Sequence, residues 1–350
     1  MYKKIFMGIA AVAALTLVSC SSDDLNSLSD NSSKNEAISF DGYWGRSAVS
    51  VNGSRGSVID KAEDLQKVTE GFGVFGHYKK DDGTEFGSNW FDNVKVTYSS
   101  QDAKWTYSPV QYWLPQGHID FLAYAPRVEE TKLKDNTSCI DFTVEKEVTK
   151  QKDLLWANAT NQTKENIANT NNKVKFKFAH ALSRLGYTVK LNNDYTGTTI
   201  TLNKITLAGS ADENTNAFYT AGTIDLSYTS SSTTASLWNT SSSDKQNFTW
   251  FSSDQKLTNS VANNTEYLFV IPQDFSASAT DKLYVIVEYT IKDYNGVTTP
   301  MKNTVYKKLE KNFEQGKAYT INLTIGLTPI EFDADVTPWA DGDKEDITWN

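Results

Sequence analysis

The chain has 350 residues, of which 43 are acidic and 34 are lysine or arginine, and its formal net charge at pH 7 is −9. An acidic chain repels nucleic acid and anionic lipid, so we expect no nucleic-acid partner and no basic membrane-binding patch. The length is sufficient for two domains with substantial cores.

The first residues are organised like a bacterial lipoprotein signal. Two lysines precede an uncharged, mostly apolar run from Ile5 to Val18, which is too short to span a membrane. Residues 17–20, Leu-Val-Ser-Cys, resemble a lipobox, in which cleavage falls before the cysteine and its thiol is acylated. We therefore expect a signal peptide over residues 1–19, lipidation at Cys20 and attachment to the membrane through lipid only. The alternative is an ordinary signal peptide with a chance cysteine.

Residues 20–37 are rich in Ser, Asp and Asn and predict a flexible tether. The patterns that follow are those of strands: residues 173–178 alternate between lysine and apolar side chains, and Asp293-Tyr-Asn-Gly296 is a hairpin turn. Further strands are predicted over residues 119–124, 185–191, 199–207, 248–251, 266–271, 282–292, 303–309 and 317–325, with one short helix within 60–69.

Many strands joined by polar turns, without βαβ alternation, predict an all-β fold built from sandwiches. Residues 161–172 are the clearest polar interruption of the strand pattern. We place the domain boundary there, which gives an N-terminal β-sandwich over residues 38–165 and a C-terminal β-sandwich over residues 166–350.

Signatures of catalysis are missing from the sequence. Residues 71–76 match G-x-G-x-x-G, but a turn-like segment rather than a helix follows them, which argues against nucleotide binding. The three histidines, His77, His118 and His180, lack metal-ligand spacing, and His180 is expected to hold a bend in the chain. We therefore predict no catalytic residue, no metal and no cofactor, and a protein that is not an enzyme.

Several segments, taken in order, resemble the fimbrillin-like lipoproteins of Bacteroidota, a family of fimbrial subunits and tip proteins. They are the lipobox ending at Cys20, Ile38-Ser-Phe40, Phe72-Gly-Val-Phe75, Tyr112-Trp-Leu-Pro115, Ile119–Pro126, Asp153–Ala157, Phe178–Leu185, Gly316–Tyr319 and Ile330–Trp339. The resemblance implies two tandem transthyretin-like β-sandwich domains and a location at the cell surface, in an outer-membrane-anchored fimbrium. It also implies assembly with other fimbrial subunits by strand donation.

In polymerising members of that family, a trypsin-like protease cuts after an arginine and removes the first strand, and a neighbouring subunit then donates a strand to the open groove. Arg55 and Arg46, each flanked by Gly and Ser, are the candidate cleavage sites. The candidate donor residues are Ile321, Leu323, Ile325, Ile330 and Phe332.

Two other functions stay open from the sequence. A monomeric surface glycan-binding lipoprotein would present some of the nine tryptophans to polysaccharide, although core packing is the better expectation for Trp90, Trp105, Trp113, Trp156, Trp250 and Trp339. An anchored glycan hydrolase is the weaker alternative. A tip or adhesive subunit would have a ligand on a host or bacterial surface as a further partner.

Overall fold

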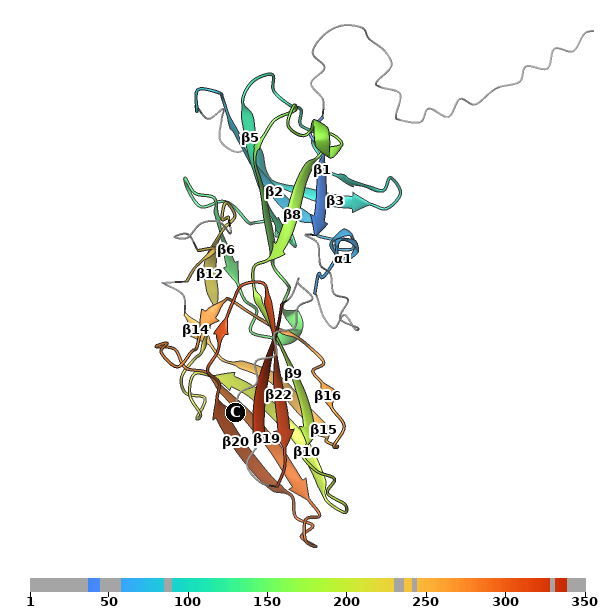
Figure 1. Cartoon of the computed structure of the whole chain (residues 1–350), viewed down its shortest axis with the longest axis vertical. Coiled ribbons are helices and arrows are strands. Elements are labelled where there is room, and N and C mark those ends of the chain that lie inside the picture. Colours follow the sequence, from blue (N-terminus) through green and yellow to red (C-terminus); the bar gives the residue numbers. More distant parts are fainter. Residues whose placement is uncertain are drawn as a thin grey trace, which may run out of the picture. The chain divides into compact units, whose positions relative to one another are not determined.

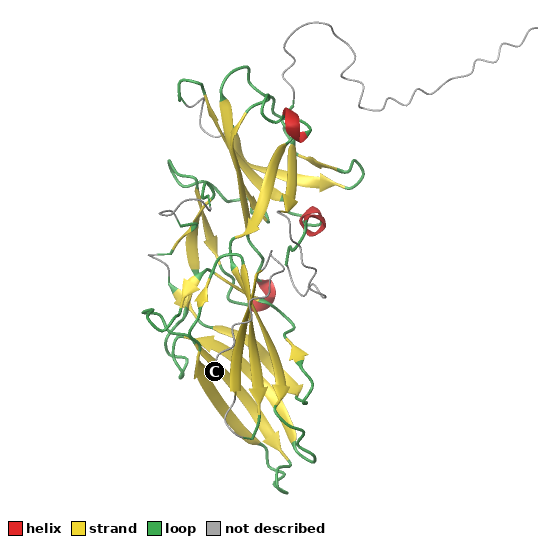
Figure 2. Ribbon diagram, viewed as in Figure 1, coloured by secondary structure: helices red, strands yellow, loops and turns green. Residues whose placement is uncertain are grey.

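The computed structural model describes residues 37–44, 58–84, 90–229, 236–240, 244–327 and 331–338. Strands dominate these residues (Figure 1), and Figure 2 shows how little helix accompanies them. The only α-helix among them, α1 (Ala62–Gln66), lies inside the predicted helical span. The all-β prediction is confirmed.

Among the described residues, the first sheet has seven strands, with β1 (Phe40–Trp44) at one edge. Its order is β1, β8 (Val174–His180), β7 (Leu155–Gln162), β5 (His118–Ala125), β2 (Phe72–Lys79), β3 (Phe91–Ser99) and β4 (Lys104–Thr106). Within this sheet β1 and β8 run parallel, whereas the other neighbours are antiparallel. The two edges approach one another, since the hydroxyl of Tyr107, next to β4, donates a 2.8 Å hydrogen bond to the carbonyl of Ile38, just before β1.

Two larger sheets follow in the second half of the chain. One has the order β15 (Phe248–Lys256), β10 (Thr199–Ala208), β19 (Tyr284–Lys292) and β20 (Met301–Lys308). The other has the order β16 (Ala262–Asn263), β9 (Ser183–Leu191), β22 (Lys317–Ile325) and β23 (Glu331–Pro338), with β17 (Leu268–Val270) also paired to β9. Residues of both, among them Leu185 and Val287, share one buried cluster, as in a β-sandwich.

Short elements complete the description. They are β6 (Cys139–Thr143) with β12 (Ala221–Asp225) and β13 (Trp238–Asn239), β11 (Phe218–Tyr219) with β14 (Lys245–Gln246), β18 (Gln273–Asp274) with β21 (Asn312–Phe313), and the 3-10 turns η2 (Val148–Lys150) and η3 (Ala168–Thr170). The predicted turn between β19 and β20 is present, with Asn295 and Gly296 at φ 52° and 79°.

The G-x-G-x-x-G segment is part of strand β2. A Cβ added at Gly73 would lie 2.5 Å from both the Asn93 side chain and the Tyr124 ring, and one at Gly76 would lie 2.9 Å from the Phe91 ring. The glycines therefore permit close packing on the sheet, and no helix follows to bind a phosphate.

Alternate residues of β5 and β2 enter two different clusters of buried residues. Phe121 and Phe72 belong to a cluster rich in aromatic rings, whereas Leu122 and Phe75 belong to the larger cluster that includes the C-terminal sandwich. Both faces of these strands are therefore covered. This explains why Ile119–Tyr124 reads as a nearly continuous apolar run.

Strand β8 pairs with β1 and β7, so the chain leaves the first sheet after His180 and enters the next at Ser183. The polar stretch at residues 161–172 is the connection between β7 and β8 within one sheet. The boundary at residues 165/166 stays a prediction, and the strand pairing favours a position near Ala181–Leu182.

Candidate functional site

Among the described strands, β1 forms a backbone ladder with β8 alone. Its five residues, Phe40–Trp44, pair with residues 174–178 of β8 (Figure 1). The preceding residues add two backbone hydrogen bonds of 2.8 Å, from Ile38 N to the carbonyl of Gln111 and from Val174 N to the carbonyl of Ser39. A short edge strand with a single ladder can leave its sheet without breaking the pairing of the other strands.

The inner face of β1 fills an aromatic pocket. Phe40 is 1% exposed. The centroids of four other rings, Phe91, Tyr107, Phe121 and Phe176, lie 5.3 to 5.6 Å from that of Phe40. Burying a side chain of this size stabilises the fold by about 1.5–3 kcal/mol. If β1 departed, the pocket would be left as an exposed apolar trench.

Gly42, the next inward-facing position, lies against three other side chains. A Cβ there would be 3.3 Å from Leu65 Cδ2, 3.3 Å from the Phe178 ring and 3.6 Å from the Trp105 ring. These contacts involve the ends of side chains, which can move by a few tenths of an ångström. The position therefore has room for a methyl group but not for a large side chain.

Strand β8 presents two different faces to an edge partner. Val174, Phe176 and Phe178 are buried, whereas Lys175 and Lys177 are exposed. Without β1, the backbone groups of β8 that pair with it would lack a strand partner. Such unpaired groups beside an apolar trench are costly, and an incoming strand would satisfy both.

Residues 58–60, downstream of β1, are held by contacts with Asp153 and Arg184. The Asp153 carboxylate accepts hydrogen bonds from Ile59 N, at 3.3 Å, and from Nδ1 of His180, at 2.9 Å. Asp60 forms an ion pair with Arg184 at 3.4 Å. His180 is 3% exposed, and its bond to Asp153 joins the end of β8 to the residues just before β7. The contribution of Asp153 was missed because an isolated acid before an apolar strand gives no periodic signal.

The predicted processing sites lie outside the described residues. Arg46 and Arg55 belong to residues 45–57, which connect the end of β1 to the fixed segment at Val58–Asp60, and Cys20 precedes residue 37. Cleavage at either arginine would separate β1 from the rest of the chain, while Val58 and Ile59 would keep their buried places.

The predicted donor residues lie in two strands, β22 and β23, which differ in the number of strands they pair with. Ile321, Leu323 and Ile325 are at most 2% exposed and lie in β22, which pairs with β9 on one side and β23 on the other. Ile330 lies outside the described residues. Phe332 lies in β23, an edge strand whose backbone pairs only with β22 among the described strands. Removing β23 breaks one ladder, whereas removing β22 breaks two.

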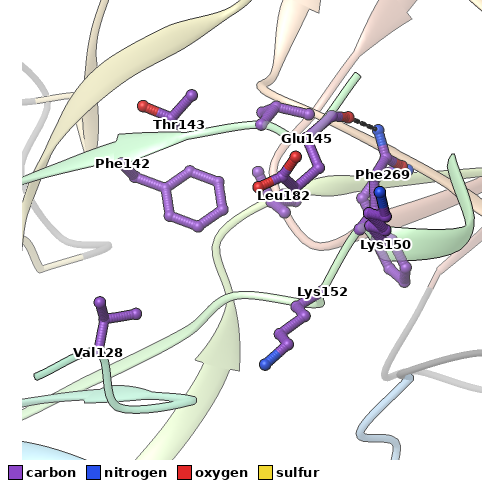
Figure 3. Close-up of a pocket in the computed structure, with 10 residues that line it drawn as sticks. Val128, Phe142, Thr143, Glu145, Lys150, Lys152, Leu182 and Phe269 are labelled. Atoms are coloured by element: carbon purple, nitrogen blue, oxygen red, sulfur yellow. Dashed lines mark hydrogen bonds between the residues drawn. The ribbon is translucent and has the colours of Figure 1, made fainter. Parts of the chain in front are cut away.

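A hollow of about 250 Å³ lies near η2 and the start of β9. Figure 3 shows Phe142, Leu182 and Phe269 around it, with Lys150 and Lys152 also lining it. Both lysines already have carboxylate partners, Glu147 at 2.6 Å and Glu70 at 2.9 Å. The amide of Gln151 is bonded to the backbone of Glu145 and Phe269. The two lysines and the Gln151 amide at the hollow are therefore already engaged within the chain.

The described part of the chain also bears on metal, glycan and membrane binding. There, no group of three or more His, Cys, Asp or Glu side chains could hold a metal ion. Trp105, Trp113 and Trp250 are buried, and Trp90 and Trp156 are half-buried; Trp339 lies outside the described residues. In the same part of the chain, no helix has the length and apolar character needed to cross a bilayer.

Comparison with known proteins gives a consistent result. A fimbrillin-like family model matches residues 61–339. A fimbrial protein of Bacteroides vulgatus ATCC 8482 has a similar structure, with a TM-score of 0.61 and 20% identity over 87% of this chain and 99% of that one. A putative cell adhesion protein of Bacteroides ovatus ATCC 8483 has a TM-score of 0.51 and 16% identity over 89% and 100% of the two chains.

A search of curated proteins finds no match. The family model spans most of the chain and includes all the strands described here except β1. At these identities the two structures show a shared fold, and the resemblance seen in the sequence is confirmed. The chain belongs to the fimbrillin-like family.

Proposed function

We propose that this protein is a non-catalytic structural or adhesive subunit of a cell-surface fimbria, assembled by strand donation after loss of β1. The observation that carries the proposal is the placement of β1. It is an edge strand with one ladder, its Phe40 fills an aromatic pocket, and an arginine-bearing segment follows it. The similar structures described as a fimbrial protein and a putative cell adhesion protein support the same role.

In this proposal, the N-terminal segment directs the precursor to the outer membrane. Cleavage before Cys20 and acylation of its thiol anchor the precursor in the outer membrane, with residues 20–37 as the tether. A trypsin-like cut at Arg55 or Arg46 then separates β1 from residues 58 onward. Because Asp153 and Arg184 hold Ile59 and Asp60, the cut opens the groove without loosening the chain beyond it.

The donor in this scheme is β23 rather than β22. Withdrawing β22 would expose Ile321, Leu323 and Ile325 and break its ladder with β9. Withdrawing β23 leaves that ladder intact, and its sequence Glu-Phe-Asp-Ala-Asp-Val alternates as a donor must. The contact is head-to-tail, so it propagates as a filament.

Limited trypsin treatment of the purified full chain tests the proposal. We expect discrete N-terminal loss at Arg55 or Arg46, followed by ladders of bands that resist SDS. Arg46→Ala with Arg55→Ala should abolish both, and Arg127→Ala, outside the segment, serves as the control. A processed chain that stays monomeric and is retarded in polysaccharide-containing gels would overturn strand donation in favour of glycan binding.

A further inference from the structure

The chain contains a short internal match between its first strand and its last. Residues 38–42 read Ile-Ser-Phe-Asp-Gly, and residues 330–334 read Ile-Glu-Phe-Asp-Ala. Three of the five positions are identical, and the last pairs the two smallest residues. Residues 40–42 of the first segment lie in β1, beside β8, and residues 331–334 of the second begin β23.

Superposing the two sequences places residues of suitable size at the inward positions of the groove. Phe332 takes the position of Phe40, whose pocket is built from four aromatic rings. Ala334 takes the position of Gly42, where the nearest atoms lie 3.3 Å from an added Cβ. That site accepts a methyl group with a slight shift of its neighbours. The alternation of large and small side chains is thus the same in both strands.

The outward positions carry complementary charge. Asp41 lies opposite Lys175 in the β1–β8 ladder, and Tyr43 lies opposite Lys177. In the superposed sequence Asp333 replaces Asp41 and Asp335 replaces Tyr43. Opposite charges on neighbouring strands stabilise their pairing. The C-terminal segment therefore matches the lysines of β8 better than β1 does.

We propose that residues 332–336 from a second copy of this chain bind along β8 in the direction and register of β1, with Lys175 and Lys177 selecting the acidic donor. This rests on the proposed function and adds to it the partner, the register and the residues that determine specificity. Phe332 pairs with Val174, Ala334 with Phe176 and Val336 with Phe178. In the precursor, β1 then occupies the position of the donor strand but matches the two lysines of β8 less well.

Charge reversal tests the selection. Trypsin-processed Lys175→Glu/Lys177→Glu chains should form SDS-resistant dimers roughly tenfold more slowly than the unsubstituted chain, because two attractive pairs become repulsive. Asp333→Lys/Asp335→Lys chains should show a similar loss. Combining all four changes in one chain restores attraction and should bring the rate back to within about twofold.

Two features of the chain provide controls for the charge-reversal experiment. Within its own hairpin, Asp333 pairs with Asn322 and Asp335 with Thr320, so neither position faces a charged residue in that ladder. Lys292→Glu/Lys302→Glu is the matched control, since it changes net charge equally at exposed positions on β19 and β20. The control should assemble at the unsubstituted rate.

Disulfide crosslinking tests directly the register of the donor strand along β8. A processed Lys175→Cys chain mixed with a processed Asp333→Cys chain should form an intermolecular disulfide on mild oxidation, because facing strand residues meet the required Cα separation. An Asp335→Cys chain should couple to Lys177→Cys instead. Crosslinks only between other pairs of positions, or assembly rates unchanged by the charge reversal, would overturn this register. Neither result would contradict strand donation itself. Absence of ladders from the unsubstituted chain would overturn strand donation itself.

Discussion

The edge at β1 and the centre of the C-terminal sheet at β22 differ in what holds them. Among the described residues, β1 has one parallel ladder of five residue pairs and buries Phe40, whereas β22 has a ladder of eight pairs on each side and buries Ile321, Leu323 and Ile325. In the proposed assembly, the first is replaced by another strand with the same pattern, and the second stays in its sheet. The proposal thus requires a weakly held edge strand beside a well-paired central strand, which is the difference between β1 and β22.

The two regions also differ in the composition of their cores. The cluster around β1 is rich in aromatic rings, among them Phe40, Phe72, Phe91 and Phe176, whereas the cluster around β22 is mainly Leu, Ile and Val. Rings joined by edge-to-face contacts form a pocket that accepts one more ring. An aromatic pocket is therefore suited to recognise a donor phenylalanine.

The largest expected effect comes from emptying the pocket. Phe40→Ala should lower the free energy of unfolding of the precursor by about 3–5 kcal/mol, because a buried phenylalanine is lost. The processed, assembled form should be unaffected, since β1 is absent from it. Urea unfolding of both forms measures the difference.

Tyr43→Ala is the control for that comparison. It lies on the same strand, but its side chain is 40% exposed, so the precursor should change by less than about 1 kcal/mol. An equal loss in the precursor and in the assembled form would show that β1 stays in place and would remove the distinction between the two regions.

The converse effect is expected in β22. Ile321→Ala should cost about 2–5 kcal/mol in the precursor and in the assembled form alike, because the strand stays in its sheet throughout. Thr324→Ala, half-buried on the same strand, should cost far less. Stability that falls in the precursor but recovers on assembly would identify β22 as the exchanging strand.

Local patterns were sufficient to predict most of the long strands. The alternating lysines and apolar residues before His180 predict β8, and the Asn-Gly pair predicts the turn between β19 and β20. The two-residue strands, such as β11 and β14, could not be predicted, because two residues carry no periodicity. The polar stretch at residues 161–172 indicates a connection but not whether the next strand belongs to the same sheet.

The site was predictable only in part, since its main contacts join distant segments. The Ile-Ser-Phe of residues 38–40 indicates a strand, but nothing local shows that it lies beside Val174–Phe178. The match between residues 38–42 and 330–334 is visible in the sequence, yet its meaning depends on the pocket around Phe40. Likewise, Asp153 gains its role only when the fold brings Ile59 and His180 to it.

A smaller effect is expected where the chain is fixed downstream of the cleavage segment. Asp153→Asn removes a carboxylate acceptor from Nδ1 of His180 or from Ile59 N, which should cost about 1–3 kcal/mol. The freed segment should then be cut by trypsin after the exposed Lys61 as well as at the upstream arginines. Mass spectrometry of the fragments detects the extra cut. Asp60→Asn, whose ion pair with Arg184 is partly exposed, should give less of it; an unchanged fragment pattern in Asp153→Asn would show that other contacts hold the segment.

The smallest effect at neutral pH concerns Tyr187, in the C-terminal sandwich. Burial raises the pKa of Tyr187 from 10.0 to about 12, so its neutral form is favoured in the folded state. That contribution is fully present below pH 10 and is lost as the pH rises toward 12, by up to about 2–3 kcal/mol. Tyr187→Phe keeps a ring beside Trp250 and should change stability by less than about 1 kcal/mol at pH 7, while flattening the loss between pH 10 and 12.

Tyr319 provides the contrast that makes the alkaline experiment decisive. Burial raises the pKa of Tyr319 to about 12 as well, but its hydroxyl also donates to the Asn312 carbonyl at 3.0 Å and accepts from Glu314 N at 2.8 Å. Tyr319→Phe should therefore cost about 1 kcal/mol or more already at pH 7, because Glu314 N and the Asn312 carbonyl lose a partner. Circular dichroism during urea unfolding at pH 7, 10 and 12 separates the two variants. If Tyr187→Phe unfolds with the same alkaline slope as the unsubstituted chain, Tyr187 is not what makes the sandwich sensitive to base, and the core around β22 is less tightly closed than its burial indicates.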